Sequence, residues 1–166
     1  MRSHIASLIS QYSRAGVLID TNLLLLLIIG GLRVELVETF RRTNNHFVAD
    51  DYFQFSDLIR PLSLIVTTSL IFTEVSNFID NLGDPDKASA FERLADLSHF
   101  DVRDIPLSTL VSAPAFRLYG LSDAAIVHLA QSGVLIITID APLYGYISDT
   151  GIECINYNHI GFANAR

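Results

Sequence analysis

Gly16-Val17-Leu18-Ile19-Asp20-Thr21-Asn22-Leu23 decides the fold, because a short apolar run ends there in a carboxylate, a hydroxyl and an amide. Residues 16–19 lack polar alternation, which predicts a strand buried on both faces, and residues 21–29 predict the helix after it. Gly133-Val134-Leu135-Ile136-Ile137-Thr138-Ile139-Asp140 repeats this pattern before another helix. Ligands of open α/β sheets bind at the carboxyl ends of the strands, so we expect Asp20 and Asp140 to lie together at that edge.

Predicted strands and helices alternate along the chain, which is typical of a mostly parallel sheet covered by helices. Gly30 and Gly31 are expected to end the helix at residues 21–29, and Ser122 is expected to cap a later helix. Strands are predicted at residues 16–19, 64–66, 100–103, 134–139 and 152–155. Helices are predicted at residues 4–13, 21–29, 33–42, 50–60, 67–80, 87–97, 106–119 (as one or two short helices), 122–131 and 142–148.

The composition is that of one globular domain. The chain has 166 residues, of which 50% are hydrophobic, and its apolar runs are far shorter than the ~20 residues that cross a bilayer. No signal peptide is evident and Cys154 is the only cysteine, so we expect a single cytoplasmic domain over residues 1–166 with no disulfide. The net charge of −7 provides no overall basic field, so any phosphate binding has to be local or metal-mediated.

Two further acids stand in sequence surroundings that indicate a site. Glu74 lies in mid-helix among apolar and small residues, and a buried glutamate needs a partner or a metal ion. Asp123 begins the helix predicted at residues 122–131. Gathering these two acids with Asp20 and Asp140 is costly without cations, whereas Mg²⁺ or Mn²⁺ converts the group into a hard, oxygen-rich site.

Three of the four acids also have a purely structural interpretation, which the sequence leaves open. Asp20 can be explained as the cap of the helix that follows its strand. Glu74 can be explained as an outward-pointing residue beside Asn77. An acid at the position of Asp123 is stabilised by the dipole of its own helix.

Four motifs in a fixed order carry a family resemblance: Val17-Leu18-Ile19-Asp20-Thr21-Asn22, Thr73-Glu74-Val75-Ser76-Asn77, Leu121-Ser122-Asp123-Ala124-Ala125 and Ile137-Thr138-Ile139-Asp140. Over nearly the whole chain they resemble the PIN-domain proteins, metal-dependent ribonucleases that include toxins of bacterial toxin–antitoxin pairs. The resemblance implies a three-layer α/β/α sandwich and hydrolysis of RNA with Mg²⁺ or Mn²⁺. It further implies that Asp20, Glu74, Asp123 and Asp140 are the catalytic and metal-binding residues, that Asn22 and Thr138 support them, and that an antitoxin-like protein is a partner.

The chain departs from the family pattern in two places. An extra helical segment at residues 34–60 is longer than the compact toxins usually have between their first two strands. Asp140 is followed by Ala141-Pro142, where many relatives carry another polar or acidic residue. The sequence therefore leaves open whether one or two metal ions are held.

Two other classes of protein also place aspartates at strand ends. Receiver domains and haloacid-type phosphatases do so, but they need a lysine beside the phosphoryl group. Lys87, the only lysine, falls in a polar turn-to-helix stretch, and Asn22 stands where the phosphatase pattern has its second aspartate. A PIN-like binding or scaffold module without activity is a further alternative.

A basic cluster lies near the extra segment, and an aromatic cluster lies within it. Arg33, Arg41, Arg42 and His46 either contact phosphates or form a solvated helix face. Phe47, Tyr52, Phe53 and Phe55 either cover the core or, if exposed, predict a homodimer interface. Cys154 is expected to be buried in a strand, and His46, His99, His128 and His159 lack the spacing of a zinc site.

Overall fold

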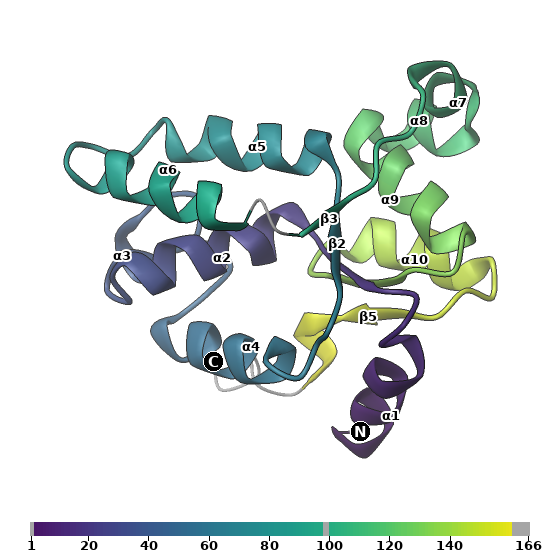
Figure 1. Cartoon of the computed structure of the whole chain (residues 1–166), viewed down its shortest axis with the longest axis horizontal. Helices are drawn as coiled ribbons and strands as arrows, with labels where there is room; N and C mark the ends of the chain where they lie inside the picture. The colour runs from purple at the N-terminus through teal and green to yellow at the C-terminus, as the bar shows by residue number, and fades with distance from the viewer. Residues whose placement is uncertain (1, 98–99, 161–166) are drawn as a thin grey trace.

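A computed structural model describes residues 2–97 and 100–160 of the chain. Five strands form one all-parallel sheet with helices on both faces, so the three-layer α/β/α sandwich expected from the sequence is confirmed (Figure 1). Of the histidines considered above, His99 lies outside the described residues.

The strands are short and lie in the order β3-β2-β1-β4-β5. The central strand β1 (Val17–Ile19) lies between β2 (Ile65–Thr67) and β4 (Leu135–Thr138), and the edges are β3 (Asp101–Val102) and β5 (Cys154–Asn156). Because β2 and β3 extend to one side of β1, and β4 and β5 to the other, the strand order reverses between β1 and β4. Sheets of this type bind ligands at that switch point, beyond the carboxyl ends of the strands.

The helices agree with most of the predicted positions, and the long stretch after β3 forms two short helices. In Figure 1, α2, α3, α5 and α6 lie to the left of β2 and β3, and α9 and α10 lie to their right. The helices are α1 (Arg2–Tyr12), α2 (Thr21–Leu32), α3 (Leu36–Thr39), α4 (Ala49–Ile59), α5 (Ser69–Ile79), α6 (Asp86–Asp96), α7 (Leu107–Ser112), α8 (Pro114–Tyr119), α9 (Leu121–Gln131) and α10 (Ala141–Asp149), and the 3-10 helix η2 (Tyr157–Ile160) follows β5.

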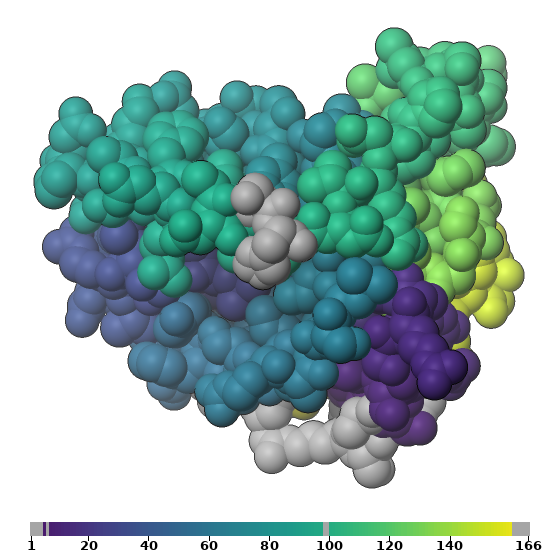
Figure 2. Space-filling view, viewed as in Figure 1, coloured from purple at the N-terminus to yellow at the C-terminus, as the bar shows by residue number. Residues whose placement is uncertain are grey.

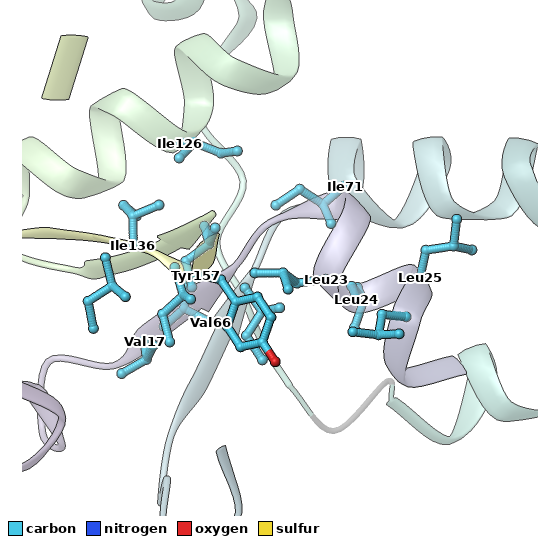
Figure 3. Close-up of a cluster of buried hydrophobic side chains, with 14 of the residues drawn as sticks. Val17, Leu23, Leu24, Leu25, Val66, Ile71, Ile126, Ile136 and Tyr157 are labelled. Atoms are coloured by element: carbon cyan, nitrogen blue, oxygen red, sulfur yellow. The ribbon is translucent and has the colours of Figure 1, made fainter. Parts of the chain in front are cut away.

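The apolar helix α2 is the centre of the packing. Its leucines and isoleucines are buried nearly all round, because α3, α4, α5 and α6 pack against it. A helix that is apolar on every side belongs to the core rather than to the surface. Figure 3 shows Leu23 and Leu24 of α2 in one buried cluster with Val66 of β2 and Ile71 of α5.

Gly30 and Gly31 do not end α2, so that prediction was wrong. The helix continues through both glycines to Leu32. A Cβ atom at Gly30 would lie 2.4 Å from Cγ of Tyr52, and one at Gly31 would lie 2.0 Å from a guanidinium nitrogen of Arg93. Gly30 therefore allows α4 to approach α2 closely, and Gly31 leaves room for the Arg93 side chain of α6, so both have a packing role rather than a terminating one.

The helix predicted at residues 33–42 is also wrong in extent, because only the single turn α3 forms. Thr43 is fully buried, and its hydroxyl donates to the carbonyl oxygen of Phe40 at 3.0 Å. The chain therefore turns over residues 41–46 and enters the core again at Phe47. This turn leaves Arg41 and Arg42 exposed outside any helix.

Ser122 is not the cap of α9, contrary to the prediction. Gly120 holds that position with a φ of 89°, and the helix begins at Leu121. The Ser122 side chain is buried, and its hydroxyl has no hydrogen-bond partner among the described residues.

The aromatic cluster of the extra segment belongs mainly to the core. Phe47 and Phe55 are buried, Tyr52 packs against Gly30, and Phe53 alone of the four is exposed, at 53%. These residues therefore do not form the exposed patch on which a homodimer interface was predicted, and the homodimer stays a prediction. The α7–α8 segment projects from the molecule (Figure 2) and exposes Leu107 and Leu118.

In the ranges that the structure describes, no helix has both the length and the apolar character that crossing a bilayer requires.

Candidate functional site

Asp20 lies at the end of the central strand and is buried, with 5% of its surface exposed. One carboxylate oxygen accepts a 2.6 Å hydrogen bond from the Thr21 N–H, so Asp20 does cap α2. The other accepts a 2.5 Å hydrogen bond from the Thr138 hydroxyl. Burial raises the pKa of Asp20 to about 6 against these two hydrogen bonds, with smaller upward contributions from Asp140 and Glu74.

Asp140 lies beyond the neighbouring strand β4 and caps the next helix. Its carboxylate accepts a 2.8 Å hydrogen bond from the N–H of Leu143 in the first turn of α10. Its own N–H donates to the Thr138 hydroxyl oxygen at 2.9 Å, and this same hydroxyl donates to Asp20. Thr138 is fully buried. Because its hydroxyl bonds to both strand-end aspartates, it links Asp20 and Asp140 across the switch point.

Glu74 approaches from α5, which follows β2. Its carboxylate accepts a 2.8 Å hydrogen bond from the Thr21 hydroxyl, and Thr21 is itself buried. The half-buried Glu74 therefore faces the end of β1, contrary to the outward-pointing alternative. Thr21 was not among the predicted site residues, although its position between Asp20 and Asn22 was a sequence signal for it.

Asp123 approaches from the first turn of α9. Burial and, to a smaller extent, the charges of Asp20, Asp140 and Glu74 together raise the pKa of its carboxyl to about 7. These electrostatic contributions show that the side chain lies near the other three acids. The helix dipole alone would stabilise the charged form and lower the pKa, so burial, together with the neighbouring acids, outweighs the dipole at this position.

The structure thus brings Asp20, Glu74, Asp123 and Asp140 to one edge of the sheet from four different elements. The carboxylates lie close enough to influence one another, but in the described part of the chain no three Asp, Glu, His or Cys side chains are already arranged to hold a metal ion. The donor set nevertheless suits a hard cation, because it offers carboxylate oxygens whose mutual repulsion a positive charge would offset.

Asn22, the remaining predicted residue, lines a neighbouring pocket of about 640 Å³. Phe78 and Asn81 at the end of α5 line it as well, and the turn after α3 contributes Arg41, Arg42 and His46. Arg33, which the sequence grouped with these basic residues, lies elsewhere and forms a 2.5 Å ion pair with Asp86. The predicted basic cluster is therefore smaller than expected, and it shares its pocket with Asn22, which lies two residues after Asp20.

The lysine-dependent alternatives find little support at this site. Lys87 lies on α6 and forms an ion pair with Asp80 at the end of α5. Cys154 lies half-buried on β5, and burial raises the pKa of its thiol to about 12, which disfavours a nucleophilic role. With Lys87 and Cys154 set aside, the carboxylates are the groups at the switch point that could take part in chemistry.

No protein-family model matches the chain, and no curated protein matches its sequence. The resemblance to PIN-domain proteins therefore stays a prediction from the four sequence motifs.

Proposed function

We propose that the chain is a metal-dependent endoribonuclease that hydrolyses RNA phosphodiester bonds with Mg²⁺ or Mn²⁺, in the manner of a toxin-type PIN domain. The observation that carries this proposal is the meeting of four acids from β1, α5, α9 and β4 at the switch point of a parallel sheet. Helix capping alone does not account for it, because asparagine caps a helix as well as aspartate and needs no buried charge.

Asp20 and Asp140 would be the central ligands of the ion, and Glu74 and Asp123 would complete its coordination or orient the attacking water. When bound, a divalent ion supplies a water of lowered pKa and neutralises charge on the phosphate. Thr138 holds the carboxylate of Asp20, and Thr21 holds that of Glu74, so two hydroxyls fix the directions of two acids. Such supporting hydrogen bonds typically change metal affinity or activity by about 10- to 100-fold.

Cleavage of mixed RNA by the purified protein tests the proposal, with Mn²⁺ or Mg²⁺ and with excess chelator. Glu74→Gln is the informative variant, because the amide oxygen can still accept from Thr21 while the charge is lost. We expect it to cut at least about 10-fold more slowly. Asp149→Asn, at the exposed end of α10, is the matched control and should cut normally. Cleavage that survives full chelation, or equal activity of the Glu74 variant, would contradict the proposal.

A catalytically silent binding module is the principal alternative. It predicts neither stabilisation by Mn²⁺ nor RNA cleavage, whereas the nuclease predicts both. A homodimer and a small antitoxin-like partner are further proposals that the resemblance suggests, and light scattering at about 10–100 μM protein, where weak dimers form, would test the homodimer.

A further inference from the structure

We infer that the pocket beside the acids binds the phosphate backbone of a single-stranded polynucleotide, and that Arg41 and Arg42 contact successive phosphates there. This inference deepens the proposed function, because it identifies where the strand on one side of the cleaved bond would lie. The pocket has a volume of about 640 Å³, and its arginines come from the extra segment.

The charge of the pocket points to an anionic ligand. The chain as a whole carries a net charge of −7, yet no carboxylate lines this pocket among the described residues. Four other basic residues form ion pairs with aspartates, namely Arg33, Arg60, Lys87 and Arg103. Arg41 and Arg42 form no ion pair with any described acid and are exposed. Two unpaired guanidinium groups in one concave site are suited to bind phosphate.

The side chain of Arg42 is held in place, and the turn that carries both arginines is anchored in the core. The guanidinium carbon of Arg42 lies 4.6 Å from the centroid of the Phe78 ring, a cation–π contact that orients the planar group. The turn that carries both arginines is anchored by Thr43 and Phe47, which are buried. A side chain that is already oriented loses less conformational freedom when it binds.

The polar lining adds donors for a phosphate or sugar. Asn22 and His46 line the same pocket and bring an amide and an imidazole to it, whereas the amide of Asn81, which also lines it, already donates to the carbonyl oxygens of Asn77 and Phe78. Side-chain amides contribute many of the hydrogen bonds that proteins make to nucleic-acid backbones.

The position of the pocket matches a strand that continues from the acids. Asn22 lies two residues beyond Asp20, and Phe78 lies four residues beyond Glu74 on α5. Four residues of α-helix rise about 6 Å, and phosphates follow one another at about 3.4 Å along the axis of a stacked strand. The pocket would therefore hold the phosphates one or two nucleotides from the bond at the acids.

Binding of a fluorescent 12-nucleotide oligouridylate in excess chelator tests the inference without hydrolysis. Each arginine–phosphate contact contributes about 0.7 to the slope of log affinity against log salt concentration for single strands. We expect the Arg41→Ala, Arg42→Ala double variant to bind several-fold more weakly at 50 mM salt and to lose about 1.4 from this slope. The Arg41→Lys, Arg42→Lys variant keeps both charges and should retain most of the slope.

Arg14→Ala combined with Arg117→Ala is the matched control, since it removes two arginines that lie outside the pocket. It should bind as the unchanged protein does. Failure of the unchanged protein to bind, or the same salt slope in the alanine variant, overturns the inference; circular dichroism confirms that each variant is folded. A protein that binds through Arg41 and Arg42 but cleaves nothing supports the inference and contradicts the proposed function. Metal-dependent cleavage with no contribution from these arginines contradicts the inference alone.

Discussion

Thr138 donates a 2.5 Å hydrogen bond to the buried carboxylate of Asp20, across 118 positions of the sequence. The same hydroxyl accepts the N–H of Asp140 at 2.9 Å, so one buried oxygen serves both strand-end acids. Thr67 at the end of β2 makes a useful comparison. It is buried to 1% exposure, but its hydroxyl has no partner among the described residues.

Thr138→Val and Thr67→Val therefore should have opposite effects on stability. Valine has nearly the shape of threonine, so each change tests the hydroxyl alone. Removing the Thr138 hydroxyl leaves one oxygen of the buried Asp20 carboxylate and the N–H of Asp140 without their partner, and we expect a loss of about 1–3 kcal/mol in the free energy of unfolding. The Thr67 hydroxyl loses its hydrogen bonds to water on folding and gains none in the part of the protein that the structure describes. Removing it should therefore leave the free energy of unfolding unchanged or raise it. Denaturation in urea at pH 7 measures both, and equal losses would contradict the assigned hydrogen bonds.

The metal-free protein should become less stable as the pH rises from 5 to 7.5. The folded-state pKa is about 6 for Asp20 and about 7 for Asp123, both above the ordinary value of 3.8. Between the ordinary and the raised pKa the folded state binds more protons than the unfolded chain, so stability falls with rising pH. Melting temperatures in chelator across this range measure the effect.

Asp123→Asn should flatten this pH profile, because it removes the group with the larger of the two shifts. Mn²⁺ should flatten it too in the unchanged protein, since a bound cation offsets the charge of the acids. A profile that Asp123→Asn leaves unaltered would show that this carboxyl does not titrate in the range.

Two of the four acids could be placed together from the sequence because their meeting follows from topology. Parallel strands end at one edge, so Asp20 and Asp140 had to lie near each other once β1 and β4 were neighbours. Glu74 was recognisable as a charge in an otherwise apolar helix stretch. The hydrogen bond between Thr21 and Glu74 depends on how α5 packs beside α2, and sequence spacing carries no information about that contact.

The basic pocket could not be predicted from periodicity. Val34, Leu36, Val37 and Phe40 have helical spacing, and that pattern favoured one helix through Arg42. The turn arises because Thr43 and Phe47 gain burial that a continued helix would deny them, which is a tertiary effect. The same kind of effect keeps α2 helical through two glycines, where the local signal favours an end.

Gly30→Ala should destabilise the protein, although alanine is the better helix former by about 1 kcal/mol. Its Cβ would lie 2.4 Å from Cγ and 2.8 Å from Cβ of Tyr52, atoms near the backbone that cannot move aside without shifting α4. Overpacking of this kind costs about 1–3 kcal/mol. We expect a lower free energy of unfolding in urea and an unchanged helical circular-dichroism spectrum.

Gly31→Ala provides the matched comparison, because its Cβ meets only the far end of the Arg93 side chain, which can rotate away. This variant should be as stable as the unchanged protein or more so. Equal destabilisation by both substitutions would mean that the glycines serve the backbone conformation of α2 rather than its close packing against α4.

Asp20→Asn separates the cap from the metal ligand. Asparagine can still accept from the Thr21 N–H, so the cap is kept. Without metal, the relief of repulsion among four acids should offset the loss of the carboxylate oxygen that accepts from Thr138, which leaves the variant as stable as the unchanged protein or more stable. With Mn²⁺ at a hundredfold excess over its dissociation constant, the unchanged protein should gain about 2.7 kcal/mol. The variant should lose most of that gain, as melting curves with chelator and with Mn²⁺ would record, and it should lose its RNA cleavage.

Asp104→Asn is the control, because Asp104 follows β3 and accepts hydrogen bonds from Ser69 at the start of α5, but is exposed. An Asp20 variant that responds to Mn²⁺ as strongly as the Asp104 variant would reduce Asp20 to a helix cap, and the proposed nuclease would lose its central ligand.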